Sequence, residues 1–300
     1  MKLKEFPAQD VRDMYTRVGN QAEVILSPEA ESLADFHAFL EKNFKPGEVE
    51  SLEVFQEELS RNKNPDSKTR FICTLLKDPL DNKFVSGAYG SVQDGILAIR
   101  FTLTEAKLYL GYPVSKQEKK PGFKGFRGYR GTGLSQRVDE LLLGVAREQQ
   151  ELMHPGKKLE VLVGEAVDQS EAYWNGFEIE PGNGMRRLYK PGNGEQVYYR
   201  LPPLEWNADG TPFDNRVVKE NLQIAVAGSP KQISVEKLEQ VLKSWWDSWY
   251  IRRRERFQDD KAWEKHKNTV RMILEDEIIK PIKNYEVLDL LSRDEREKNN

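Results

Sequence analysis

The stretch Phe126-Arg127-Gly128-Tyr129-Arg130-Gly131-Thr132-Gly133-Leu134-Ser135-Gln136 places three glycines among arginines and leads directly into an amphipathic run at 134–149. Apolar residues recur at helical spacing in that run, which predicts a helix with one apolar face. A glycine-rich turn that opens a helix presents unpaired backbone N–H groups at the positive end of the helix dipole. The stretch therefore predicts an anion site, above all for phosphate. The alternative is a turn that only begins a helix, because short glycine patterns are weak fingerprints.

Two other phosphate-binding loops do not fit this stretch. A Walker loop ends in Gly-Lys-Ser or Gly-Lys-Thr, whereas this turn ends in Gly133-Leu134-Ser135. A dinucleotide-binding turn follows a strand directly, whereas a basic loop with proline and glycine precedes this one. The anion expected here is therefore neither a nucleoside triphosphate in a Walker loop nor a dinucleotide in a Gly-x-Gly-x-x-Gly turn.

Composition excludes several classes of protein. The net charge of −3 over 300 residues gives no global positive field for nucleic acid or acidic membranes. The single cysteine, Cys73, lies in an apolar run and predicts a buried, inert thiol in a reducing compartment. No stretch has the length and apolarity of a membrane span, and the N-terminus lacks a signal-peptide core. The three histidines are scattered without metal-ligand spacing. We expect a cytoplasmic protein with no metal and no nucleic-acid or membrane partner.

The order of predicted elements narrows the fold. Two helices, ending near residues 40 and 61, precede three strands joined by tight turns, which indicates an α+β fold. The predicted strands of this first part lie at 70–76, 83–92 and 95–104. After the helix that follows Gly133 come a strand at 158–167, a short helix at 169–174 and two strands at 185–190 and 195–201.

Two motifs in this order carry a resemblance to a known family. The first is Tyr129-Arg130-Gly131-Thr132-Gly133-Leu134, and the second is Ser170-Glu171-Ala172-Tyr173-Trp174-Asn175-Gly176-Phe177. With a strand between them, they resemble the pyrophosphate loop and the Gly-Phe helix of the GCN5-related N-acetyltransferase (GNAT) family, over residues 20–202. The resemblance implies a mixed, mostly antiparallel sheet flanked by helices, and acetyl-coenzyme A as co-substrate.

The chain departs from the family pattern at three points. Gly128 stands where the family usually has Gln or Arg, which removes a side-chain contact but leaves the backbone cradle. The lysine-bearing connection at 105–126 resembles an insertion, and it is either a solvated loop or a contributor to anion attraction. Tyr173 lies one residue closer to Phe177 than the family's tyrosine usually does.

The resemblance implies a coenzyme site centred on the glycine-rich turn. Backbone N–H groups from Arg130 to Leu134 would hold the pyrophosphate, and the Ser135 hydroxyl would add a contact. Arg127, Arg130 or the preceding lysines would meet the other coenzyme phosphate. The pantetheine arm would pair with backbone where the strands at 95–104 and 158–167 separate. The implied coenzyme-binding residues are Arg127, Gly128, Tyr129, Arg130, Gly131, Thr132, Gly133, Leu134, Ser135 and Gln169.

The chemistry requires a base and a proton donor. An amine must lose a proton before it attacks a thioester, so a carboxylate or a chain of waters acts as base. Glu165 and Glu105, each near a strand end, are the candidate bases, and the alternative for each is a solvated glutamate. The resemblance nominates Tyr173 as the donor to the departing thiolate, and the alternative is ordinary packing beside Trp174.

The last third of the chain is predicted to be a separate region. Leu201-Pro202-Pro203 marks a boundary between an acetyltransferase domain at 1–203 and a C-terminal helical extension at 204–292, followed by a disordered tail at 293–300. Helices are predicted at 217–227, from 235 to the basic run at 252–256, and at 260–279. Tryptophans form a stripe on the second of these, and such a stripe favours packing over nucleic-acid stacking. The stripe packs either on the rest of the chain or on a second copy, as in a homodimer.

These observations predict an N-acyltransferase that moves an acetyl group from acetyl-coenzyme A to an amine acceptor, a small molecule or a peptide, by direct attack in a ternary complex. The alternative hypothesis is a non-catalytic acyl-coenzyme A-binding or assembly module whose C-terminal helices form the partner site. The sequence does not identify the acceptor, because one fold supports many substrates.

Overall fold

The computed structural model describes most of the chain. The described residues are 22–44, 49–78, 83–104, 134–166, 178–192, 194–200, 202–203, 206–213, 219–229, 231–251, 254–292 and 295. Among them, no helix is long and apolar enough to cross a membrane.

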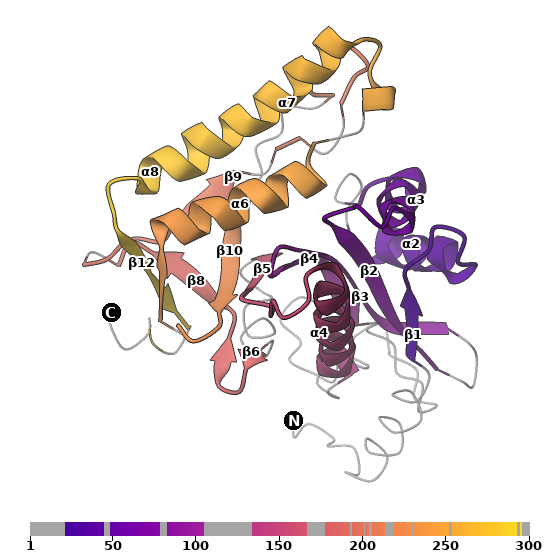
Figure 1. Ribbon diagram of the computed structural model, residues 1–300, viewed down its shortest axis with the longest axis horizontal. Helices are drawn as coiled ribbons and strands as arrows, with labels where there is room; N and C mark the ends of the chain where they lie inside the picture. The colour runs from indigo at the N-terminus through magenta and orange to yellow at the C-terminus, as the bar shows by residue number, and fades with distance from the viewer. Residues whose placement is uncertain are drawn as a thin grey trace, which may run out of the picture.

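A ten-stranded sheet forms the centre of the protein (Figure 1). The strand order is β1-β2-β3-β4-β5-β10-β8-β12-β11, and β9 pairs with β10 beside this path. Every pairing is antiparallel except that of β4 with β5. The strands are β1 (Ala22–Ile25), β2 (Arg70–Asp78), β3 (Lys83–Gln93), β4 (Ile96–Thr104), β5 (Val161–Ala166), β8 (Arg186–Tyr189), β9 (Tyr198–Arg200), β10 (Lys219–Val226), β11 (Gln232–Ser234) and β12 (Val287–Leu291), with a separate small pair, β6 (Glu178–Glu180) and β7 (Asn183–Gly184).

The first half of the sheet matches the predicted order of elements. Helices α2 (Ser32–Asn43) and α3 (Leu52–Ser60) precede the antiparallel strands β2, β3 and β4, and η1 (Arg61–Lys63) extends α3. Asp94 and Gly95, with φ of 50° and 83°, form the turn between β3 and β4. Two consecutive residues with positive φ give the backbone twist that a tight hairpin requires, so this predicted turn is confirmed.

Helices cover both faces of the sheet. Alternate residues of each strand point to opposite faces, and on β4 Ala98 packs in one apolar core whereas Leu97 packs in the other. The first core receives side chains from α2, α3, α6 (Val235–Trp249) and α7 (Asp260–Leu274). The second core receives α4 (Leu134–Met153).

Two of the three helices predicted after residue 203, α6 and α7, are present, and each of these two begins at a side-chain cap. The Ser234 hydroxyl accepts a hydrogen bond from the Lys237 N–H, at 3.2 Å, and the Asp259 carboxylate accepts one from the Ala262 N–H, at 2.7 Å. Such caps satisfy N–H groups that the helix leaves without partners. A π-helical turn (Glu275–Ile279) and α8 (Lys280–Ile282) continue α7, and η3 (Arg254–Arg256) lies between α6 and α7. Helices α6 and α7 run side by side (Figure 1).

The predicted helix at 217–227 is wrong. Residues 219–226 form β10, which lies between β5 and β8 and pairs with both. Leu222 and Ile224 fill the core under α6, whereas Ala225 fills the core under α4. The apolar run is therefore buried on both faces of the sheet, a pattern that short segments of helix and strand share.

The part of the chain after residue 203 is consequently not only helical. It supplies β10 at the centre of the sheet and β11 and β12 at one edge. The sheet runs across the predicted boundary, because β10 connects β5 to β8. The tryptophan stripe packs within the chain: Trp245, Trp246 and Trp249 are each at most 2% exposed and belong to the core beneath α6.

Candidate functional site

The two parallel strands at the centre of the sheet separate part-way along their length. Their ladder ends where Ile99 of β4 lies opposite Gly164 of β5. Beyond this pair, β4 runs on to Thr104 alongside β3, and β5 runs on to Ala166 alongside β10. We call the unpaired stretch of the two strands beyond Ile99 and Gly164 the β4–β5 gap. An extended ligand that enters the gap could pair with backbone N–H and C=O groups on both sides, as an added strand does.

A β-bulge sets the start of the gap. The register between β3 and β4 shifts after Tyr89, so Arg100 is an extra residue in β4. A bulge bends its strand and increases the local twist, and this one follows directly on Ile99, the last residue of β4 that pairs with β5. Gly90 allows the close approach at this point, because a Cβ there would lie 2.6 Å from the Ala98 carbonyl oxygen. The β4–β5 pairing thus ends at the point where β4 carries its bulge.

Helix α4 begins at the open end of the gap. Near its start, the Thr102 hydroxyl of β4 donates to the Asp139 carboxylate at 3.2 Å. Near its end, the Gln150 side-chain oxygen accepts from the Gly95 N–H at 2.9 Å. The helix therefore runs antiparallel to β4, and its positive N-terminal end, at Leu134, lies on the side where β4 and β5 diverge. An anion held there would lie beside a ligand in the gap.

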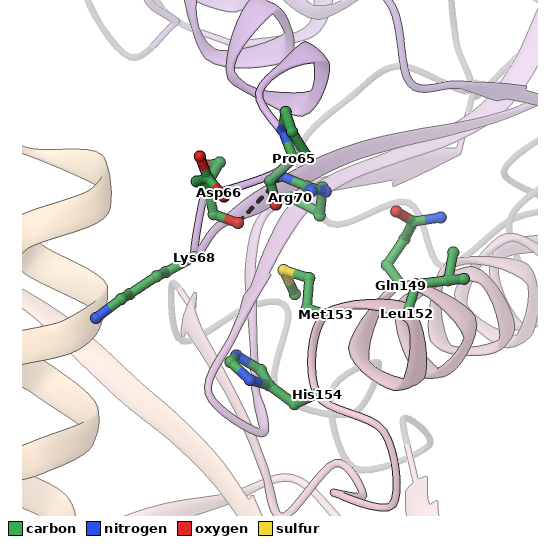
Figure 2. Close-up of a pocket in the computed structure, with 9 residues that line it drawn as sticks. Pro65, Asp66, Lys68, Arg70, Gln149, Leu152, Met153 and His154 are labelled. Carbon is green, nitrogen blue, oxygen red and sulfur yellow. Dashed lines mark hydrogen bonds between the residues drawn. The ribbon is translucent and has the colours of Figure 1, made fainter.

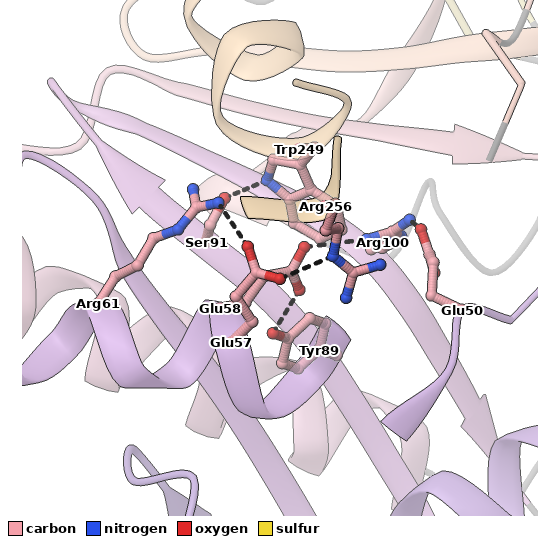
Figure 3. Close-up of polar contacts among 9 residues, drawn as sticks. All are labelled: Glu50, Glu57, Glu58, Arg61, Tyr89, Ser91, Arg100, Trp249 and Arg256. Carbon is pink, nitrogen blue, oxygen red and sulfur yellow. Dashed lines mark hydrogen bonds and ion pairs between the residues drawn. The ribbon is translucent and has the colours of Figure 1, made fainter. Parts of the chain in front are cut away.

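A buried group of charges lies on the opposite face of the sheet from α4 (Figure 3). It consists of Glu50, Glu58, Tyr89, Arg100 and Trp249, and we call it the Arg100 cluster. Arg100 forms ion pairs with Glu50 and with Glu58, the latter at 3.4 Å. All three side chains are at most 7% exposed. Removing such charges from water is costly, so their mutual pairing is a condition of their burial.

Aromatic groups complete the Arg100 cluster. The Tyr89 hydroxyl donates to Glu58 at 2.7 Å, and the Arg100 guanidinium lies 4.6 Å from the centre of the Trp249 ring. The Trp249 indole N–H donates to the Ser91 hydroxyl. Burial, and next the charge of Glu58, raise the pKa of Tyr89 well above its ordinary value. Tyr89 is therefore a neutral donor held by Glu58, and it is poorly suited to lose a proton in catalysis.

The C-terminal region closes over α3 at this cluster. Trp249 comes from the last turn of α6, and Arg256 of η3 donates to Glu57 of α3 at 2.9 Å. Arg61 also lies 3.9 Å from Glu57. The first core continues around these contacts, since Phe71 and Tyr89 pack against the Trp249 ring. The contacts at this cluster therefore join residues that lie far apart in sequence.

A small pocket of about 350 Å³ lies at the other end of α4 (Figure 2). Its walls include Lys68, just before β2, and Arg70, the first residue of β2, together with Leu152 and Met153 at the end of α4 and His154 directly after it. The Arg70 guanidinium already donates to backbone carbonyls of the 64–67 turn. Because the pocket borders the C-terminal end of α4, it is separate from the gap.

Most of the predicted site residues lie outside the described part of the chain. Glu165 is in β5, one position beyond the last pair with β4 and opposite Leu222 of β10. Leu134 and Ser135 open α4. These three predicted residues, Glu165, Leu134 and Ser135, therefore lie along the β4–β5 gap or at its open end. Those outside the described residues are Glu105, Arg127, Gly128, Tyr129, Arg130, Gly131, Thr132, Gly133, Gln169 and Tyr173.

Three enclosed polar residues, Arg100, Glu58 and Gln223, were not predicted from the sequence. Arg100 stands alone in an apolar strand, between Ile99 and Phe101, and a lone charge in a central strand indicates a buried partner. Glu58 follows Glu57 on α3, and sequence does not show which of the two is buried. Gln223 alternates with Leu222 and Ile224, a period-2 pattern that would have indicated a strand. This alternation was the feature of the sequence from which the strand at 219–226 could have been predicted.

Comparisons with known proteins give likeness in structure only. No family model matches the chain, and no curated protein matches it in sequence. It is similar to a putative GNAT-family acetyltransferase from Bacteroides thetaiotaomicron, with 13% identity over 76% of this chain and 96% of that one, at a TM-score of 0.42. It is also similar to the ribosomal-protein-S18-alanine N-acetyltransferase of Escherichia coli, with 11% identity over 69% and 97% of the two chains, at a TM-score of 0.36.

A third similar structure is the PaiA N-acetyltransferase of Thermoplasma acidophilum in complex with coenzyme A, with 8% identity over 68% of this chain and 98% of that one, at a TM-score of 0.35. Such low overlaps do not carry an assignment by themselves. The strand order, antiparallel β1 to β4, then α4, then β5 parallel to β4, agrees with the mixed, mostly antiparallel sheet that the resemblance in the sequence implied. The fold is GNAT-like.

Proposed function

We propose that the protein is an acyltransferase that moves an acetyl group from acetyl-coenzyme A to an amine. The observation that supports this most is the β4–β5 gap with the N-terminus of α4 at its mouth. The pantetheine arm of coenzyme A is extended and carries two amides, so it can pair with both strand edges. Its pyrophosphate is an anion that the start of a helix favours. The glycine-rich turn at 126–133 precedes this helix in the chain.

The reaction proceeds by direct attack in a ternary complex. The amine nitrogen forms a bond to the thioester carbonyl carbon, and the C–S bond breaks. The coenzyme leaves as a thiolate that takes up a proton, while the amine loses one to a base. Glu165, beside the gap, and Glu105, just after β4, are the proposed bases, acting directly or through water, and Tyr173 is the proposed donor to the thiolate. Much of the acceleration would come from holding the thioester and the amine in position.

The alternative is a non-catalytic acyl-coenzyme A-binding module with a partner site on the C-terminal helices. The tryptophan stripe that would form such a site is buried against the sheet of the same chain. The acceptor itself is an amine of a small molecule or a peptide. A reducing, cytoplasmic setting agrees with the single cysteine, Cys73, which is free and buried.

The decisive test is coenzyme binding by the intact protein. We expect coenzyme A to raise the melting temperature, since a ligand that binds only the native state stabilises it. The double variant Gly131→Asp, Gly133→Asp should lose this shift, because it adds side chains and negative charge to the phosphate site. The matched control Asn268→Asp, Asn284→Asp adds the same two charges at exposed positions after β10 and should keep it.

A second measurement separates transfer from binding. Native mass spectrometry with acetyl-coenzyme A and a pool of amines should show a product heavier by one acetyl group, together with free coenzyme A. Binding without any acetylated product would favour the non-catalytic module. An unchanged melting temperature at millimolar coenzyme A would remove both hypotheses.

A further inference from the structure

Gln223 is a buried amide without a partner. Its side chain is 0% exposed, and neither its oxygen nor its nitrogen has a hydrogen-bond partner among the described residues. Another enclosed glutamine among the described residues, Gln150, is 1% exposed; its oxygen accepts a hydrogen bond from the Gly95 N–H, whereas its nitrogen has no hydrogen-bond partner. Buried amides that lack partners destabilise a fold, and an apolar residue of the same shape would do better. The sequence therefore retains at this position a group that the isolated protein does not use.

The register of β10 determines on which face of the sheet the Gln223 side chain lies. On β10 it pairs with Gly164 of β5 and with Arg187 of β8. Leu222 and Ile224 on either side of it face the core under α6, so Gln223 faces the side of the sheet that carries α4. Gly164 is also the last residue of β5 to pair with β4.

Gly164 is the residue of β5 that lies between Gln223 and β4, and it has no side chain. Neighbouring strands lie about 4.8 Å apart, and a glutamine side chain extends about as far. Because Gly164 has no side chain, β5 places none between Gln223 and Ile99, the last residue of β4 that pairs with β5 and the edge of the β4–β5 gap. An amide offers one acceptor and a two-proton donor in a fixed plane. Its best complement is another amide.

We propose that Gln223 binds the pantetheine arm of coenzyme A from the side of β10. The Gln223 nitrogen donates to a pantetheine carbonyl, and the Gln223 oxygen accepts from a pantetheine N–H, over Gly164. This assignment rests on the proposed function and adds a side-chain contact to the backbone pairing expected within the gap. Gln223 is a binding residue, and the pantetheine amide is the group it recognises.

The test compares two buried glutamines. Gln223→Met replaces the amide by an apolar chain of similar shape, so the ligand-free protein should melt at the same temperature or about 2 °C higher. Its affinity for coenzyme A, measured by calorimetry, should fall about tenfold. Affinity for adenosine 3′,5′-bisphosphate, which lacks the pantetheine arm, should not change. Gln150→Met should do the opposite, lowering the melting temperature and leaving both affinities unchanged.

Several outcomes would overturn the proposal. A lower melting temperature of ligand-free Gln223→Met, or a failure to fold, would mean that the amide already has a partner within the protein. Gln223→Asn, which fits without added volume, should also weaken coenzyme A binding, and unchanged binding by it or by Gln223→Met would refute the contact. If the wild-type protein binds coenzyme A and the variants bind equally well, only the Gln223 assignment fails. If the wild-type protein binds no coenzyme A, the proposed function fails with it.

Discussion

The buried polar groups on the two faces of the sheet differ in whether they have partners within the protein. Under α6, Arg100, Glu50 and Glu58 are buried together and pair with one another. On the α4 side, Gln223 is equally buried and pairs with nothing in the described chain. A closed network stabilises the arrangement of α3, β4 and α6, whereas an open amide leaves a hydrogen bond for a ligand. Both groups are polar and buried, so neither property separates a residue that stabilises the fold from one that binds a ligand. The difference is whether the side chain already has a partner within the protein.

Removing the central charge of the Arg100 cluster should have the largest effect. Arg100→Met leaves Glu50 and Glu58 buried without their cation, so we expect the free energy of unfolding to fall by about 3–5 kcal/mol. Urea unfolding followed by tryptophan fluorescence measures it. The same substitution at Arg256, whose ion pair with Glu57 is partly exposed, should cost at most about 1 kcal/mol.

Adding Glu50→Gln and Glu58→Gln to Arg100→Met should restore part of the loss, because the two uncompensated charges are then gone. If Arg100→Met costs no more than Arg256→Met, the cluster does not hold the fold together. The contrast with Gln223, whose replacement should be neutral or stabilising, would then disappear.

The bulge offers a sharper test of the gap itself. Gly90→Ala places a methyl group 2.6 Å from the Ala98 carbonyl oxygen, so β3 and β4 must move apart. We expect a loss of about 1–3 kcal/mol in stability and a smaller coenzyme-induced rise in melting temperature. Gly144→Ala is the matched control, since its methyl group would meet nothing within 4 Å on helix α4 and should stabilise the protein slightly. Equal coenzyme-induced shifts in the two variants would contradict a role for the bulge in shaping the gap.

The smallest expected effect is a change in the free energy of unfolding with pH, caused by the proton that Tyr89 holds. Its pKa is raised by burial and by Glu58, so the native state holds this proton more tightly than the unfolded state. The contribution is fully present below the ordinary tyrosine pKa, near 10, and is lost as pH rises above it, by up to about 1.4 kcal/mol per pH unit. Urea midpoints at pH 9 to 11 measure this slope. Tyr89→Phe should reduce the slope, and an identical slope in that variant would assign it to other groups.

Local patterns in the sequence predicted much of the framework. Alternation predicted β4, the amphipathic run predicted α4, and the stripe of tryptophans predicted the buried face of α6. The turn at Asp94 and Gly95 could be predicted from the sequence because only a few residue types adopt positive φ without strain. These elements follow from interactions between residues close together in the chain.

Contacts between distant parts of the chain were not predictable in the same way. Trp249 meets Ser91, and Arg100 meets Glu50, through packing that no local pattern encodes. The helix predicted at 217–227 failed because an apolar run buried on both faces suits a central strand as well as a helix, and only its pairing with β5 and β8 decides. For the candidate site, sequence located the opening of α4 and Glu165 but missed the unpaired amide of Gln223. The predictions for Tyr173 and for the glycines at 128–133 lie outside the described residues.

The insertion of β10 between β5 and β8 has a consequence for synthesis on the ribosome. Strand β5 is made early, but its neighbour on the far side is residues 219–226, so β5 keeps an exposed edge until more than fifty further residues have emerged. An exposed central strand is a template for pairing with other chains. The nascent chain thus depends on its own C-terminal third to protect the strand that lines the gap. Chains that terminate near residue 203 should aggregate rather than accumulate as a working domain.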